Sequence, residues 1–182
     1  MSSRPSTTQV NRGTERAVRV YIALGSNLPS EFGSPSENVR LAMDRISAWS
    51  VETPRRSSLW SSEPEDCPPG SDIFINAVIA ITLRHDSTPE SLLTKTKALE
   101  KEFGRVEAGE RNAPRPIDID LVAFGDETRH GPDLMLPHPR AHKRGFVLYP
   151  LAEIDPDYRI PGQALSVAEL AQKTQLPEKQ EI

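Results

Sequence analysis

The sequence predicts an α+β fold in which two helices cover one face of a single antiparallel sheet. Two observations lead to this expectation. Apolar segments typical of strands recur along the chain, and two amphipathic segments with helix-start signals lie between them, with two strands in succession in the middle. The 182 residues suffice for one domain with a sizeable core. We expect this domain over residues 17–175, between a disordered tail at 1–16 and a frayed tail at 176–182.

The first half of the predicted domain begins with a strand, VRVYIAL at 18–24, which ends in the turn Gly-Ser-Asn. The segment SPSENVRLAMDRISAW at 34–49 then predicts a helix with Ser36 as N-cap. Its apolar residues recur at helical spacing: Val39, Ala42, Met43 and Ile46. Residues 51–61 are expected to be extended, as a second strand interrupted by Pro54.

The second half begins after a polar, proline-rich loop at 61–72. The almost wholly apolar segment IFINAVIAITL at 73–83 predicts a central strand. Residues 87–104 predict a helix, with Ser87 or Thr88 as cap, proline in the first turn and glycine as the stop.

The C-terminal third begins with PIDIDLVAF at 116–124, which predicts the next strand. Residues 136–154 indicate a loop, one helical turn and a short apolar strand, and 166–174 a last weak helix. The order β-α-β-β-α-β is that of a ferredoxin-like sandwich, with both helices on one face of an antiparallel sheet. The other face would be left for loops and a ligand.

The composition limits the classes of molecule that the protein can be expected to bind. Hydrophobic residues make up 36% of the chain and charged residues 26%, as in a soluble globular protein. The net charge of −4 argues against a nucleic-acid binder. No apolar run approaches the ~18 residues that a membrane helix needs, and the first 16 residues lack a signal-peptide segment. A single cysteine, Cys67, excludes an internal disulfide. We therefore expect a cytoplasmic protein that does not bind membranes or nucleic acid, and a monomer.

Two aspartates stand out in the predicted strand at 116–124. Asp118 and Asp120 are two residues apart, so their side chains point to the same face, while Ile117, Ile119 and Leu121 point into the core. Neighbouring carboxylates repel each other unless a cation lies between them. Oxygen ligands of this kind suit Mg²⁺, which shares substrate phosphate oxygens. The alternative is a solvated acidic face on an edge strand.

Basic residues flank the two aspartates on both sides along the chain. They are Arg105, Arg111, Arg115, Arg140, Lys143 and Arg144. Guanidinium groups bind phosphate bidentately, and metal carboxylates beside arginines are what phosphoryl-type transfer requires. The alternative is that the arginines belong to a solvated loop. The P-loop pattern is missing from the sequence. His138 and His142 do not complete a zinc set, so His138 is a candidate phosphate contact or a structural residue.

Three further residues are candidates for binding an organic ligand. Phe74 and Phe146 are explained most simply as core residues. Asn76 is different, because an unpaired amide inside an apolar strand costs about 1–3 kcal/mol. It needs a backbone partner or a ligand with matching donors and acceptors.

Four stretches together resemble the 6-hydroxymethyl-7,8-dihydropterin pyrophosphokinase family of folate biosynthesis. They are YIALGSNL at 21–28, FINAV at 74–78, APRPIDIDLVAFG at 113–125 and LPHPRAHKRGFVLYPLAEI at 136–154. The similarity extends from about residue 18 to residue 170 in matching order, and the pattern P-R-x-x-D-x-D is its most specific part. The chain departs from the usual family pattern at Glu107, Asn112 and Pro139.

The resemblance implies a ferredoxin-like fold and transfer of the β,γ-pyrophosphoryl group of ATP to the pterin hydroxymethyl oxygen. It also implies roles for individual residues. Asp118 and Asp120 would hold two Mg²⁺ ions, and Arg105 and Arg115 would belong to a mobile catalytic loop. The ATP-binding residues would be Glu100, Arg111, His138 and Arg144. The pterin-binding residues would be Ser62, Phe74, Asn76 and Phe146.

Two other functions are compatible with the residues alone. One is a Mg²⁺-dependent phosphohydrolase that uses the same aspartates on another substrate. The other is a ferredoxin-like binding module without chemistry, which would need exposed aromatic residues and a basic face. The 5% aromatic content and the negative net charge do not favour such a module.

Overall fold

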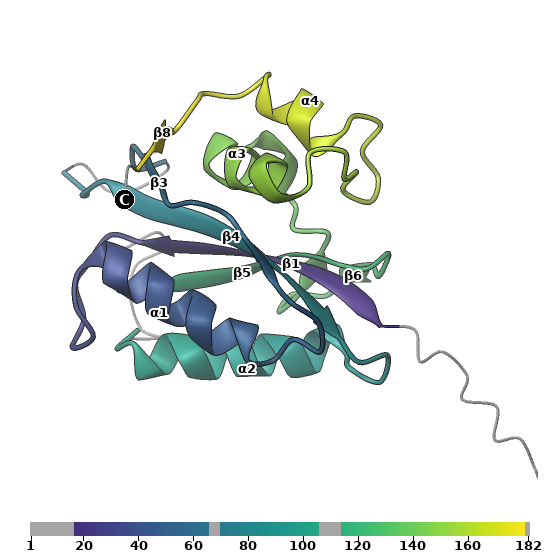
Figure 1. Ribbon diagram of the computed structural model, residues 1–182, viewed down its shortest axis with the longest axis horizontal. Helices are drawn as coiled ribbons and strands as arrows, with labels where there is room; N and C mark the ends of the chain where they lie inside the picture. Colours follow the sequence, from purple (N-terminus) through teal and green to yellow (C-terminus); the bar gives the residue numbers. More distant parts are fainter. Residues whose placement is uncertain (1–16, 66–69, 106–113, 181–182) are drawn as a thin grey trace, which may run out of the picture.

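The computed structural model describes residues 17–65, 70–105 and 114–180. The predicted N-terminal tail, Cys67 and Arg111 lie outside these ranges, as do residues 106–113 of the predicted catalytic loop between Arg105 and Arg115. The main sheet has strand order β5-β1-β4-β3-β8, and the short β2 also pairs with β4. All its pairings are antiparallel. Figure 1 shows α1 and α2 on one side of this sheet and α3 and α4 on the other.

The central strands follow the sequence prediction. β1 spans Val18–Ser26, β4 spans Phe74–Leu83 and β5 spans Asp118–Phe124. β1 lies between β4 and β5, in register along almost its whole length. The strands β2 (Arg55–Arg56) and β3 (Trp60–Ser62) both pair with β4. The ferredoxin-like α+β prediction is thereby confirmed.

The two predicted helices cover one face of the sheet. α1 spans Pro35–Ser47, and its N-cap is Ser34, not Ser36 as the sequence suggested. The Ser34 side chain accepts a hydrogen bond from the backbone N–H of Glu37, whose carboxylate accepts one from the Ser34 backbone, which forms a capping box. α2 spans Pro89–Glu102 with Thr88 as N-cap. Gly104, with a φ of 87°, follows this helix as predicted.

The other face of the sheet is covered more fully than the sequence suggested. The apolar segment expected to contain a short strand is the helix α3, Gly145–Ile154. Its buried Val147, Leu148 and Leu151 follow helical spacing and pack towards the sheet. The predicted last helix is α4, Val167–Ala171, capped by Ser166. The face expected to hold only loops and a ligand therefore has a second apolar core of its own.

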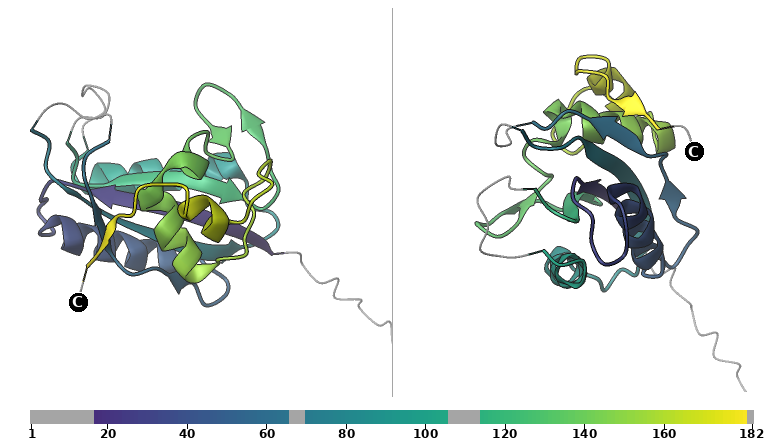
Figure 2. Two further views of the ribbon diagram at one scale, coloured as in Figure 1. Left: turned by 90° about the horizontal axis from the view of Figure 1, so that it is seen from above. Right: turned by 90° about the vertical axis from the view of Figure 1, so that its left-hand side faces the viewer.

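Three short elements complete the described part of the chain. β6 (Arg129–His130) and β7 (Met135–Leu136) form a separate two-stranded sheet, and residues Ala141–Lys143 form a 3₁₀ turn. β8 (Glu178–Lys179) lies within the segment expected to be a frayed tail, yet it pairs with β3. Figure 2 shows the same arrangement from two further directions. None of the helices in the described ranges has the length and apolarity required to cross a bilayer.

Candidate active site

A cavity open to solvent lies on the face of the sheet that carries α3. Three neighbouring strands supply its floor, each through residues two positions apart. β4 contributes Phe74 and Asn76, β1 contributes Ala23 and Gly25, and β5 contributes Asp118 and Asp120. The side chains of Ser62, Arg115, His138, Arg144 and Phe146 complete the part of the lining that the sequence predicted.

The β5 aspartates lie as the alternation along the strand predicts. Both line the cavity, while Ile117, Ile119 and Leu121 are at most 4% exposed and belong to the opposite core. The side chains of Asp118 and Asp120 are 25% and 39% exposed. They are therefore accessible to a ligand but are not on a fully solvated acidic edge.

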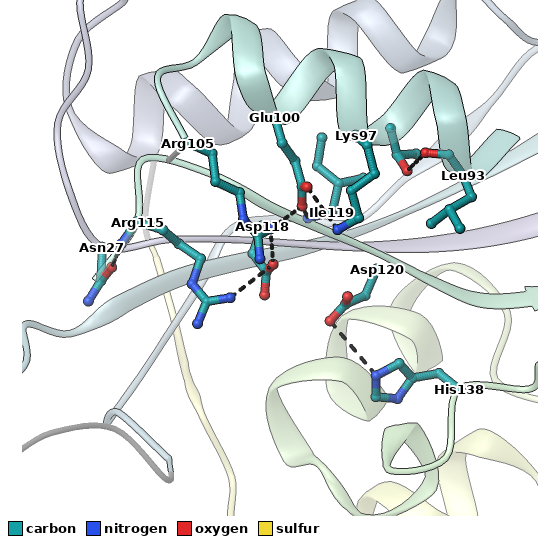
Figure 3. A network of polar contacts seen from close by, with 11 residues as sticks. Asn27, Leu93, Lys97, Glu100, Arg105, Arg115, Asp118, Ile119, Asp120 and His138 are labelled. Carbon is teal, nitrogen blue, oxygen red and sulfur yellow. Dashed lines mark hydrogen bonds and ion pairs between the residues drawn. The ribbon is translucent and has the colours of Figure 1, made fainter. Parts of the chain in front are cut away.

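Arginines surround Asp118 (Figure 3). Its Oδ1 lies 2.6 Å from Arg105 Nη1 and 3.1 Å from Arg115 Nη1. Burial acts to raise the pKa of Asp118, but the guanidinium groups of Arg115 and Arg105 outweigh it and hold this pKa below its ordinary value. Asp118 is thus kept ionised.

Asp120 has the opposite electrostatic environment. Its partial burial and the carboxylates of Asp118 and Glu100 raise its pKa to about 7. A cation in this part of the cavity would relieve that repulsion. Among the described residues, no group of three or more acidic, histidine or cysteine side chains could hold a metal ion. Two carboxylates without a third protein ligand fit Mg²⁺, which completes its octahedral coordination with water and substrate phosphate.

Glu100 and Arg105 form a layer behind the cavity lining. Glu100 is only 1% exposed, and its carboxylate accepts hydrogen bonds from the Ile119 backbone N–H at 2.8 Å, from Lys97 at 2.9 Å and from Arg105. Neither Glu100 nor Arg105 lines the cavity described above. The structure thus places Glu100 as an anchor that ties α2 to β5 and holds Arg105 beside Asp118 (Figure 3).

His138 and Arg144 face the cavity from the segment before α3. Burial, followed by the charges of Arg144 and Arg140, lowers the pKa of His138 to about 4, so its imidazole is neutral at pH 7. The His138 Nδ1 accepts a hydrogen bond from the Arg140 backbone N–H at 3.2 Å. This assigns the proton to Nε2, which lies 3.9 Å from Asp120 Oδ2. Both residues can therefore offer N–H donors to an anion.

An aromatic and amide wall forms the other end of the cavity. Phe74 and Phe146 are half-buried and line it, and Phe146 also packs against the apolar core on this face. The Arg144 guanidinium lies 5.2 Å from the Phe146 ring centroid. Asn76 is 4% exposed, and its Nδ2 donates to Ser62 Oγ at 2.9 Å. The buried amide therefore has a protein partner as well as a place in the lining.

Two further positions beside the cavity were not singled out in the sequence analysis, both in the segment Gly-Ser-Asn, whose first two residues belong to β1. Gly25 is paired with Asn76 on one side and Asp118 on the other. A Cβ at position 25 would lie 3.3 Å from Asn76 Oδ1 and 3.7 Å from the Phe74 ring, so glycine keeps the floor clear between them. Asn27 is 3% exposed, and its Oδ1 accepts from the Arg115 backbone N–H at 2.8 Å. The only available signal was a polar turn directly after a buried strand.

The sequence matches the family model described as 7,8-dihydro-6-hydroxymethylpterin-pyrophosphokinase (HPPK) over residues 21–156. A Pseudomonas aeruginosa protein named 2-amino-4-hydroxy-6-hydroxymethyldihydropteridine pyrophosphokinase is 38% identical over 144 residues, which cover 79% of this chain and 84% of that protein. The protein of the same name from Methylorubrum extorquens is 35% identical over 154 residues, covering 82% of this chain and 90% of its own length.

Longer relatives contain a region similar to this chain. The folic acid synthesis protein fol1 of Pneumocystis carinii is 37% identical over 158 residues, or 85% of this chain, but the chain spans only 20% of that protein. The crystal structure of Plasmodium falciparum HPPK-DHPS superposes on 87% of this chain and 45% of its own, with a TM-score of 0.67. At 14% identity, this last similarity supports the fold alone. From the family match and the two relatives aligned over most of their length, the chain belongs to the HPPK family.

Proposed function

We infer that the chain transfers the β,γ-pyrophosphoryl group of ATP to the hydroxymethyl oxygen of 6-hydroxymethyl-7,8-dihydropterin, as a pyrophosphokinase of folate biosynthesis. One observation carries this inference. A single cavity combines the carboxylates of β5 and neighbouring arginines with two aromatic rings and the buried amide of β4, and β1 lies between these two strands. The first group suits a triphosphate with its metal, and the second suits a flat heterocycle with a polar edge.

We propose that Asp118 and Asp120 hold two Mg²⁺ ions. The raised pKa of Asp120 and the lack of a third acidic ligand in the described part support a metal that shares substrate oxygens. Bound there, Mg²⁺ would offset the negative charge on the phosphates that are transferred. Because a carboxylate must be ionised to bind metal, a protonated Asp120 would release its proton when the ion binds.

The reaction forms one bond and breaks another. The hydroxymethyl oxygen bonds to the β-phosphorus and gives up its proton to solvent. The bond between the β-phosphorus and the oxygen that bridges to the α-phosphate breaks, and this oxygen leaves with AMP. We propose that Arg115 and Arg144, which line the cavity, bind phosphate oxygens bidentately and that neutral His138 donates one hydrogen bond to them. Arg105 is proposed to exchange its contact with Asp118 for a phosphate when ATP binds. Glu100 and Arg111 remain predicted ATP-side residues. Glu100 would act by holding Arg105 in place from its buried position.

The pterin ring is proposed to lie between Phe74 and Phe146, over the space that Gly25 leaves open. Asn76 and Ser62 would bind its polar edge. Asn76 Oδ1 faces the Gly25 side of the floor, while Asn76 Nδ2 is already bonded to Ser62 Oγ. The ring and its hydroxymethyl arm would then extend across β1 from the amide towards the aspartates.

We expect Asn76→Ala to weaken pterin binding by about tenfold or more, because the polar edge of the ring loses a partner at a cost of about 1–3 kcal/mol. ATP affinity should change little, since β1 lies between the strand of Asn76 and that of Asp120. Calorimetry with each ligand measures both affinities. Unfolding of the variant, or an equal loss for ATP and pterin, would show that Asn76 is a core residue and that the pocket lies elsewhere.

We expect Asn27→Ala to lower kcat by about tenfold with little change in the KM for pterin, because Asn27 holds the backbone of Arg115 rather than a ligand. Asn27→Asp keeps the acceptor oxygen and should recover most of the rate. Steady-state kinetics of the two variants check this. Equal loss in both would show that the Asn27 acceptor does not position Arg115.

Product analysis separates this function from the phosphohydrolase alternative. With ATP and Mg²⁺, AMP should form only when the hydroxymethyl pterin is present, whereas a phosphohydrolase would release phosphate from another substrate. A binding module would give no product in either case. The proposal includes a monomeric enzyme, and a reducing cytoplasm, which the chain's single cysteine supports.

A further inference from the structure

The C-terminal residues 175–180 extend the main sheet beside the predicted pterin pocket. Lys179 and Glu178 of β8 pair with Trp60 and Ser61 of β3, and the Gln180 backbone N–H donates to the Leu59 carbonyl at 2.9 Å. Figures 1 and 2 show β8 along the outer side of β3. We refer to residues 175–180 as the strap.

The strap supports a short strand that carries one wall of the pocket. β3 has only three residues, and its last residue, Ser62, pairs with Phe74 and accepts the hydrogen bond from Asn76. A strand this short is weakly held by one neighbour alone. β8 adds backbone pairing, and the Gln180 Nε2 donates to Ser61 Oγ at 2.9 Å, directly before Ser62.

The other end of the strap lies against the start of α3. A Cβ at Gly145 would be 2.1 Å from the Gln175 carbonyl oxygen, so only glycine allows this approach. Gly145 does not have a positive φ, which makes space the reason for the glycine. It lies between Arg144 and Phe146, which both line the cavity. The strap thus contacts the backbone directly before Phe146, the aromatic residue that forms the second wall of the pocket.

A carboxylate joins the strap, β3 and α3 at one point. Glu153, near the end of α3, accepts hydrogen bonds from the Ser58 hydroxyl at 2.6 Å, the Ser58 backbone N–H at 3.0 Å and the Trp60 indole at 3.1 Å. Lys179 of the strap donates to the same carboxylate at 2.9 Å and lies 5.7 Å from the Trp60 ring centroid. Burial opposes ionisation of Glu153, but these donors, with Ser58 first, keep its pKa below the ordinary value.

We propose that the strap positions both walls of the pterin pocket, holding Ser62 through β3 and Phe146 through Gly145, and thereby sets pterin affinity without touching the phosphate end. This proposal builds on the proposed function. The strap residues are positioning residues, since β3 and α3 lie between them and the ring. Other elements position the residues at the phosphate end. Asp118 and Asp120 belong to β5, which pairs with β1 and is bonded to α2, and Asn27 holds the backbone of Arg115. The strap takes part in none of these contacts.

The test compares the full chain with a variant that ends at Thr174, which lacks the whole strap. We expect the dissociation constant for 6-hydroxymethyl-7,8-dihydropterin to rise about tenfold, a usual size for coupling between sites, while that for MgATP stays within about twofold. A matched pair refines the test. Gln180→Pro and Gln180→Ala both lose the side-chain bond to Ser61, but only Gln180→Pro also loses the backbone bond to Leu59, so it should weaken pterin binding more.

Hydrogen exchange of the unmodified chain supplies a readout that a purely structural role would not change. Because coupling is reciprocal, saturating pterin should slow exchange of the Gln180 amide, and MgATP alone should not. Unchanged pterin affinity in the shortened chain would overturn the proposal, and so would equal loss for both ligands. If the shortened chain does not fold, the proposal is overturned when pterin leaves the exchange rate of the Gln180 amide in the unmodified chain unchanged. Failure of the unmodified chain to form AMP would instead refute the proposed function.

Discussion

Asp118→Asn and Asp120→Asn are each expected to lower kcat by about three orders of magnitude or more. Each removes a carboxylate that would bind Mg²⁺ beside the phosphates, where the metal offsets their negative charge. Both substitutions keep the size and shape of the side chain. Since both aspartates lie on the cavity floor rather than in the core, the fold should be retained. Turnover numbers at saturating ATP and pterin, over a range of Mg²⁺ concentrations, measure the effect.

The same two variants should differ in stability when Mg²⁺ is removed. Asp118 is paired with Arg105 and Arg115, so Asp118→Asn should lower the melting temperature. The pKa of Asp120 is raised to about 7, which means that its ionised form destabilises the fold above the pKa of the unfolded chain. Asp120→Asn should therefore raise the melting temperature at pH 8. Near-normal turnover in both variants at every Mg²⁺ concentration would refute the assignment of the metal site.

Arg115→Ala is expected to lower kcat by about a hundredfold, since a fixed donor to the reacting phosphates is lost. The Arg115 side chain is only 16% exposed and lies on the cavity beside Asp118, so its position is set before ligand binds. Arg115→Lys should recover little, because an ammonium group cannot form the bidentate contact. Arg45→Ala is a matched control. Arg45 is an exposed arginine of α1 that pairs with Glu102, and α1 lies on the face of the sheet opposite the cavity. A raised KM for pterin with unchanged kcat would contradict the role of Arg115.

The parts of the site that the sequence predicted depend on one local rule. Alternation along a strand puts residues i and i+2 on the same face, and this placed Asp118 with Asp120 and Phe74 with Asn76 correctly. The rule needs no knowledge of the tertiary structure, provided that the strand itself is recognised. Both strands are long and apolar on at least one face, which made them recognisable.

The parts that were missed depend on contacts between distant segments. The segment at 145–154 is apolar nearly throughout and contains Pro150, and neither feature distinguishes a buried helix from a short strand. The short β8 has no apolar pattern, and only its pairing with β3 makes it a strand. The sequence also did not show that Glu100 is buried against the Ile119 backbone, because this follows from how α2 packs on β5. Sequence spacing does not contain that information.

The central claim is that the cavity transfers two phosphates as one unit, and the position of isotopic label tests this most directly. The chain would be incubated with Mg²⁺, the hydroxymethyl pterin and ATP labelled separately at the α-, β- or γ-phosphorus. We predict that the β and γ labels both appear in the pterin product and that the α label remains in AMP. Transfer of the γ label alone, with ADP as the second product, would contradict this account.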